Sequence, residues 1–392
     1  MSNNWNVVPF TEAVDICDTF RKPINSCERA SRIKGKEQSE LYPYYGATGQ
    51  VGFIDDYITD GEYVLLGEDG APFLDAFSNK AYIISGKTWV NNHAHVLRSK
   101  TNNKFLCYYL NSFNYKGYVS GTTRLKLTQA EMKRIPVPVP PLSEQERIVS
   151  RIEELFSQLD AGVETLKKTK AQLAVYRQAV LKEAFDSIED QYYQTLNTAI
   201  LGSPQNGLYK PKSDYSDNGT PILRIDGFYD GFIVKDYYYK RVNLSVDEIT
   251  RYSLEIGDLI VNRVNSMPYL GKCALVRFLG ETTVFESNMM RIKLDNEKVN
   301  GDFLTYYLSS STGRKELTKS AKQAVNQASI NQTDVGNAIV PMPPVEIQKR
   351  LLTYIESRLS VCDSIEQTVD AALQQAEAMR QSILKDAFEG KL

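Results

Sequence analysis

The strongest constraint on the fold is a stretch that this chain contains twice. Residues 135–187 align without a gap with residues 338–390, 203 positions later, and 18 of the 53 aligned residues are identical. The first copy contains PVPPLSEQERIVSRIEELFSQLD and the second contains PMPPVEIQKRLLTYIESRLSVCD. Because this shift is close to half of the 392 residues, it predicts two similar halves and not a solenoid of short repeats.

Each copy of the repeat has the pattern of one long helix. No proline follows the opening prolines, and apolar residues recur at spacings of three, four or seven, which places them on one helical stripe. Ser143, with Glu146 three positions later, predicts a capping box at the start of the first helix. At 1.5 Å per residue, each helix would be roughly 65 Å long.

So narrow an apolar stripe on so long a helix needs a partner, and we expect the two copies to pair as a coiled coil. The alternative is that each helix packs only on its own globular domain. The stripe residues expected in this spacer coiled coil are Ile148, Ile152, Leu155, Leu159, Val163, Leu166, Leu173, Leu351, Ile355 and Leu359.

The regions outside the repeats are rich in Tyr and Gly and contain short apolar runs that are typical of strands. Residues 61–73 can be laid over residues 257–269, and residues 104–112 over residues 302–310. The second pair predicts a short helix with an apolar inner face. We therefore expect two globular regions that share a fold and differ on their surfaces.

Composition argues against several classes of protein. No run of 18 apolar residues occurs, so we expect no membrane span, and the first residues lack the pattern of a secretion signal. Five cysteines without a CxxC pair favour a reducing, cytoplasmic location over a disulfide framework. The net charge of −2 does not indicate nucleic-acid binding, but a local basic run at residues 21–36 permits a DNA partner.

Catalytic motifs are missing from the sequence. An adenine methyltransferase needs a glycine-rich cofactor loop and an Asn/Asp-Pro-Pro-aromatic tetrapeptide, whereas each Pro-Pro here is followed by Leu or Val. His93 and His95 alternate as neighbours on a strand do, and they lack a nearby Cys or third His for a metal. We expect no catalysis by this chain alone, no cofactor and no metal. A methyltransferase or nuclease acting on its own is one alternative, and a coiled-coil scaffold without DNA recognition is another.

The order of parts, with the endings LKEAF and LKDAFEGKL, resembles the specificity (S) subunit of Type I restriction–modification systems. This resemblance implies an α+β fold with a pseudo-two-fold internal repeat, in which two similar α/β target recognition domains are separated by two long antiparallel coiled-coil helices. The boundaries expected for the two domains and their spacer helices, in chain order, are 1–141, 142–189, 190–344 and 345–392.

The resemblance also implies a function in phage defence. Each globule would recognise one half of a bipartite target in double-stranded DNA. The helices would fix the spacer between the halves and dock two adenine methyltransferase (M) subunits. Restriction (R) subunits would join through the complex.

Base recognition in the major groove favours Arg and Lys toward guanine, and Asn and Gln toward adenine. Polar loop residues of these types therefore make the candidate DNA interface. In the first globule they are Tyr44, Thr48, Gln50, Thr122, Thr123, Arg124 and Lys126. In the second globule they are Gln205, Asn206, Lys210, Arg263, Asn265, Lys322, Gln323, Asn326 and Gln327.

Overall fold

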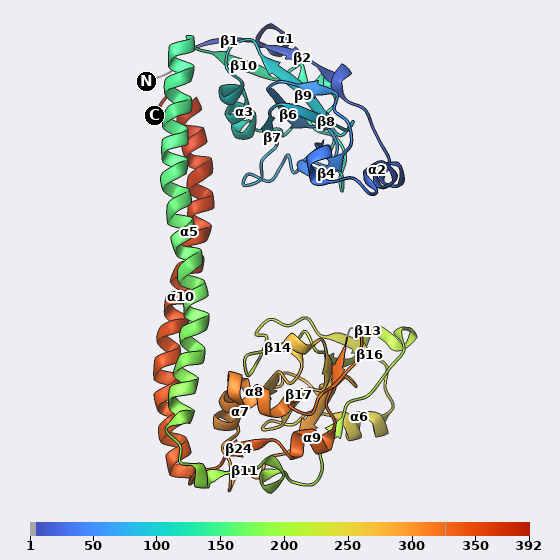
Figure 1. Cartoon of the computed structure of the whole chain (residues 1–392), viewed down its shortest axis with the longest axis vertical. Coiled ribbons are helices and arrows are strands. Elements are labelled where there is room, and N and C mark those ends of the chain that lie inside the picture. The colour runs from blue at the N-terminus through green and yellow to red at the C-terminus, as the bar shows by residue number, and fades with distance from the viewer. Residues whose placement is uncertain (1–4, 326) are drawn as a thin grey trace. The chain divides into compact units, whose positions relative to one another are not determined.

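The computed structural model describes residues 5–325 and 327–392 (Figure 1). The chain forms two compact units. The first contains the chain up to Lys168 together with Val369–Leu392, and the second contains Thr169–Thr368. Each unit therefore combines one globule with part of both long helices.

The first unit is built mainly from short strands. Its strands are β1 (Asn6–Pro9), β2 (Val14–Ile16), β3 (Tyr42–Gly46), β4 (Gly49–Ile54), β5 (Thr59–Asp60), β6 (Tyr63–Gly67), β7 (Ala81–Ile84), β8 (Lys87–Val90), β9 (Ala94–Ser99) and β10 (Pro136–Val139). Its helices are α1 (Phe10–Ala13), α2 (Ser26–Ile33), α3 (Asn103–Ser112), α4 (Gln129–Met132) and the start of α5 (Leu142–Asp186).

The second unit is also built mainly from short strands with a few short helices. Its strands are β11 (Tyr193–Thr195), β12 (Gln205–Asn206), β13 (Tyr215–Leu223), β14 (Phe228–Tyr229), β15 (Phe232–Ile233), β16 (Lys240–Val242), β17 (Leu259–Asn262), β18 (Val264–Asn265), β19 (Cys273–Leu275), β20 (Val284–Phe285), β21 (Met289–Ile292), β22 (Lys322–Gln323), β23 (Ala328–Ser329) and β24 (Ile339–Pro341). Its helices are α6 (Val246–Tyr252), α7 (Gly301–Ser309), α8 (Ser311–Thr318), α9 (Gln332–Gly336) and the start of α10 (Val345–Phe388).

The two globules have the same sheet topology. A four-stranded sheet has the order β2-β9-β6-β7 in the first globule and β12-β21-β17-β19 in the second. A second sheet contains β4-β3-β8 in the first globule and β16-β13-β20 in the second, and in each the last pair is parallel. The central strands β6 and β17 are buried along their whole length, which fits their apolar sequences YVLLG and LIVN. The expected shared fold is confirmed.

The long helices pair within each unit and run in opposite directions (Figure 1). In the first unit, Arg380 of α10 forms an ion pair with Asp160 of α5. In the second unit, Arg177 of α5 pairs with Asp363 of α10 at 2.6 Å. The two ion pairs join equivalent positions of the sequence repeat, so the pairing follows the internal two-fold pattern.

The stripe packs on the globules as well as on the partner helix. Ile148 and Ile152 are buried in one cluster with Phe105 of α3 and Leu384 of α10. Ile355 lies in a cluster that includes core residues of the second globule. Toward their ends, the long helices therefore pack both on each other and on the globules, so the two packing alternatives occur together. The other stripe residues are half-buried or buried, namely Leu155, Leu159, Val163, Leu166, Leu173, Leu351 and Leu359.

The predicted capping box at Ser143 is wrong. Helix α5 already begins at Leu142, and the amides of Glu144 and Gln145 donate to the carbonyl of Pro141 at 2.9 and 3.0 Å. Ser143 thus lies inside the first turn. Within the described part of the chain, no helix combines the length and apolar character that a bilayer crossing requires.

Candidate nucleic-acid interface

In the first globule, four separate segments surround one open hollow of about 630 Å³, and one of them is the β8–β9 connection with Asn91 and His93. The other three are the β3–β4 turn, the segment after β6, and a hairpin at residues 120–126, which follows α3 in the chain. The polar residues that line this hollow include Asp69, Asn91, His93, Thr122, Thr123 and Arg124.

The 120–126 hairpin is fixed by backbone hydrogen bonds. Ser120 and Lys126 exchange two such bonds at 3.0 and 2.9 Å. The amide of Gly70 donates to the Leu125 carbonyl at 2.9 Å. Gly121 has a φ of +96°, and a Cβ there would lie 2.4 Å from the Arg124 carbonyl oxygen, so the turn requires glycine.

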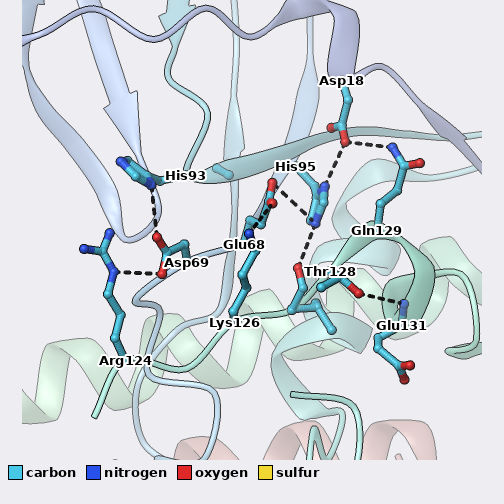
Figure 2. A network of polar contacts seen from close by, with 12 residues as sticks. Asp18, Glu68, Asp69, His93, His95, Arg124, Lys126, Thr128, Gln129 and Glu131 are labelled. Atoms are coloured by element: carbon cyan, nitrogen blue, oxygen red, sulfur yellow. Dashed lines mark hydrogen bonds and ion pairs between the residues drawn. The ribbon is translucent and has the colours of Figure 1, made fainter. Parts of the chain in front are cut away.

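Carboxylates accompany the basic residues of this hairpin. Arg124 Nε donates to Asp69 at 2.7 Å, and the other Asp69 oxygen lies 3.5 Å from His93 Nδ1. Lys126 Nζ lies 3.7 Å from Glu68. The Arg124 and Lys126 side chains remain 61% and 50% exposed, so both can still meet a ligand. Figure 2 shows this row of pairs along the hairpin.

A buried histidine contacts the residue that directly follows the hairpin (Figure 2). His95 is fully buried, with Nδ1 2.9 Å from Asp18 and Nε2 3.1 Å from the Leu127 carbonyl oxygen. With a proton on each nitrogen, the ring donates to both acceptors. Burial alone would raise the pKa of Asp18, but hydrogen bonds from His95, Val96 and Gln129 and the charge of His95 hold that pKa below its usual value.

Most residues predicted for the first globule lie exposed at these loops. Thr122, Thr123, Arg124 and Lys126 are on the hairpin, and Thr48 is in the β3–β4 turn. Gln50 follows on β4 and is exposed, although its amide donates to the Gly52 carbonyl at 3.2 Å.

Tyr44 was predicted in a loop that contacts DNA, but it lies in the core. Its side chain is 2% exposed and packs with Ile54 and Trp89. Its position on β3 turns it into the core, because alternate residues of a strand face opposite sides. The guanidinium of Arg29, from the basic run at 21–36, lies 4.7 Å from the centre of its ring.

The second globule carries a corresponding hairpin. Strands β22 and β23 form it, and β23 also pairs with β18, where Asn265 is opposite Ala328. Lys322, Gln323 and Gln327 are exposed, and Asn265 is half-buried. Asn326 lies outside the described residues. The hairpin thus brings together predicted residues from two distant stretches of sequence.

Three other predicted residues of the second globule form hydrogen bonds or ion pairs within the globule. The Gln205 amide donates to the Arg251 carbonyl at 3.0 Å and accepts from Arg291. Lys210 is 17% exposed and pairs with Glu248 at 2.8 Å. The polar groups of Gln205 and Lys210 are thus bonded within the globule, and DNA contact by these two residues stays a prediction.

Arg263 is the third of these residues. It donates from Nη1 to the Ser287 carbonyl at 3.0 Å. Its Nε is buried and has no hydrogen-bond partner among the residues that the structure describes. Arg263 is half-buried, and its bond to Ser287 supports the start of β18. Asn206, in contrast, is exposed on β12.

Some residues of these surfaces were not predicted from the sequence. Asp69, Asn91 and His93 line the first hollow, and of these only His93 was considered from the sequence, as a metal ligand without the necessary partners. In the second globule, residues 237–241 line a hollow of about 530 Å³, with Tyr238 81% exposed. The run YYYKR was a signal that could have been found, since aromatic and basic side chains together favour nucleic acid.

Comparison with known proteins identifies the family to which the chain is similar. A family model described as the Type I restriction modification DNA specificity domain matches residues 4–174 and again residues 200–375. A putative type I restriction enzyme specificity subunit of Haemophilus influenzae is 26% identical over 386 residues, covering 94% of this chain and 91% of that protein. The EcoKI specificity subunit of Escherichia coli is 28% identical over 305 residues, covering 74% of this chain but only 65% of that protein.

Solved structures show the same fold. A chain from a structure described as the basis of complex assembly and conformational transition of the type I R-M system has a TM-score of 0.69 and 16% identity, with 100% and 99% of the two chains covered. The HsdS subunit of Thermoanaerobacter tengcongensis has a TM-score of 0.50 and 16% identity, with 100% and 98% covered. The family match spans both halves, and the chain therefore belongs to the family of Type I restriction–modification DNA specificity proteins, with two copies of its domain.

Proposed function

We propose that this chain is the specificity subunit of a Type I restriction–modification complex and that each globule recognises one half of a bipartite DNA target. The observation that carries this proposal is that both globules have the same sheet topology. Each globule has a hairpin at the equivalent position, and the two hairpins expose different side chains. The first hairpin offers Arg124 and Lys126, whereas the second offers Lys322, Gln323 and Gln327. Two scaffolds of one fold with different polar groups suit two different base sequences.

The chain's own part in the reaction is recognition and positioning. The exposed Arg, Lys, Gln and Thr groups supply hydrogen bonds to base edges and phosphates. Cofactor binding and methyl transfer belong to the M subunits, and cleavage belongs to the R subunits. We place this assembly in the cytoplasm.

The long helices have features of a docking surface for M subunits. Tyr176 of α5 and Met379 of α10 occupy equivalent positions of the repeat and are 45% and 46% exposed. Val361 and Ile365 add exposed apolar area on α10. The repeated pair Tyr176 and Met379 fits a partner that binds twice, so we propose two M subunits per chain.

Methylation mapping tests the proposed function. The chain is expressed with its M partner in cells without other modification systems, and methylated adenines are mapped by sequencing. We expect a bipartite motif with a fixed gap, and no methyl transfer from the chain purified without M. A continuous motif, or transfer by the chain alone, would contradict the proposal.

A further inference from the structure

Arg124 is held at one edge of its guanidinium and open at the other. Its Nε donates to Asp69 Oδ1 at 2.7 Å, and within residues 5–325 and 327–392 its two terminal nitrogens form no hydrogen bond or ion pair. Figure 2 shows these nitrogens pointing away from Asp69. The side chain is 61% exposed, so a pair of parallel N–H donors faces solvent in a restrained orientation.

Asp69 is itself fixed on several sides. Its backbone forms a β-bridge with Lys126, and its amide donates to the His93 carbonyl at 3.4 Å. Its second carboxylate oxygen lies 3.5 Å from His93 Nδ1. A partner held by its own contacts restricts the rotamers of Arg124 before any ligand arrives, which lowers the entropy cost of binding.

Charge decides which DNA group this arrangement suits. The Asp69 carboxylate repels a phosphate that approaches the same guanidinium, and Glu68 beside Lys126 adds negative charge nearby. A base edge carries no net charge. Guanine presents two acceptors, O6 and N7, at the spacing of two parallel arginine donors. The pair therefore favours a guanine edge over the DNA backbone.

We propose that Asp69 is a positioning residue that orients the free edge of Arg124 toward guanine. The half-site recognised by the first globule then contains a guanine at the position that Arg124 meets. This inference rests on the proposed function and makes it more specific, because it names a base and the residue that determines its selection.

The test uses the full chain assembled with its M partner. Motif mapping and competition binding compare DNA with guanine or adenine at each position of both half-sites. The variants are Arg124→Gln, Arg124→Lys and Asp69→Asn. Arg124→Lys keeps the charge but removes the two-donor edge, and thus separates geometry from charge. Arg124 is largely exposed, so its variants are expected to fold.

We expect Arg124→Gln and Arg124→Lys to lower guanine discrimination at one position by at least about tenfold and to leave the other half-site unchanged. Asp69→Asn should lower the same discrimination severalfold while raising affinity for non-specific DNA, since a negative charge is lost. If Asp69 only stabilised the fold, Asp69→Asn would not lower guanine discrimination and at the same time raise affinity for non-specific DNA.

Three results would overturn the inference: an unchanged motif in Arg124→Gln, full guanine discrimination in Arg124→Lys, or unaltered guanine discrimination in Asp69→Asn. They differ from failure of the proposed function. In that case the wild-type assembly itself would give no bipartite motif in which the variants could be compared.

Discussion

The first and second globules are most alike where they contact the long helices. Phe388 of α10 packs edge-to-face against Phe105 and Tyr109 of α3, with ring centres 5.2 and 5.4 Å apart. Phe185 of α5 occupies the equivalent position of the repeat and lies between two aromatic rings of α7. Those rings belong to Phe303 and Tyr307, at 5.4 and 5.2 Å.

Polar contacts at these junctions match as well. Gln145 and Gln348 are both buried and donate to the carbonyls of Pro140 and Pro343, at 2.9 and 2.7 Å. The helices that carry the paired aromatic residues begin alike, because the side chains of Asn102 and Asn300 cap α3 and α7.

The globules differ in the connections between strands. Strands β3 and β4 are joined by the two-residue turn Ala47–Thr48, whereas residues 224–239, with the β14–β15 hairpin, join β13 to β16. Strands β7 and β8 are joined by Ser85–Gly86, whereas residues 276–283 join β19 to β20. The helix contacts constrain sequence on both partners, while a loop that faces solvent can change length at little cost.

Exchange of a whole globule is the strongest test of this difference. Replacing residues 192–337 with the matching region of a related chain should change every specified base in one half-site. The other half-site and the gap should stay the same, because the helix contacts are preserved. Methylation mapping of the chimera is the measurement, and the reciprocal exchange of residues 1–134 is its control. A change in both halves would show that the globules are not separable.

Lengthening both helices tests whether their common length sets the gap. Four residues are inserted after Lys168 and four after Thr368, where the two compact units divide. Each helix grows by about 6 Å, and DNA rises about 3.4 Å per base pair, so the gap should widen by one or two base pairs. Insertions of two residues are the control, because they rotate the apolar stripe by about 200° and should abolish assembly. A gap that does not change in the active four-residue variant would exclude this role.

The aromatic junctions allow a quantitative comparison. Phe185 is 3% exposed and Phe388 is half-buried, so Phe185→Ala should cost about 3–5 kcal/mol and Phe388→Ala about half of that. The only tryptophans, Trp5 and Trp89, belong to the first unit, so their fluorescence during urea unfolding reports that unit. Phe388→Ala should shift the fluorescence midpoint. Phe185→Ala should shift the circular dichroism transition and leave the fluorescence midpoint nearly unchanged. A fluorescence shift with Phe185→Ala and none with Phe388→Ala would contradict the assignment of each junction to its unit.

The features predicted from sequence are those with a regular period. The repeat, the long helices and the common fold followed from spacing of apolar residues, which burial enforces. Side-chain availability could not be predicted in this way. Gln205 and Lys210 have the right chemistry for DNA contact, but their partners Arg251 and Glu248 lie about forty residues away in sequence. Tyr44 was misassigned because a loop was predicted where β3 places alternate residues in the core.

The smallest expected effect concerns two aspartates that differ in the sign of their pKa shift. Asp18 has a lowered pKa, so its contribution to the stability of the first unit is present above about pH 4 and is lost as pH falls through the folded value. Burial raises the pKa of Asp258 in the second unit, although a backbone hydrogen bond from Glu255 opposes this. Its charged form therefore costs stability at neutral pH, and protonation on acidification relieves that cost.

The two substitutions should consequently act in opposite directions. Asp18→Asn should lower the stability of the first unit at neutral pH. It should also make that stability less dependent on acid, so that the urea midpoint followed by tryptophan fluorescence falls less between pH 7 and pH 3. Asp258→Asn should raise the neutral-pH stability of the second unit, because the asparagine oxygen can still accept from Glu255 without a buried charge. Circular dichroism at the same pH values reports both units, so a transition that appears there and not in tryptophan fluorescence belongs to the second unit. A decrease with both substitutions would mean that hydrogen bonding, and not the charge of the carboxylate, controls both sites.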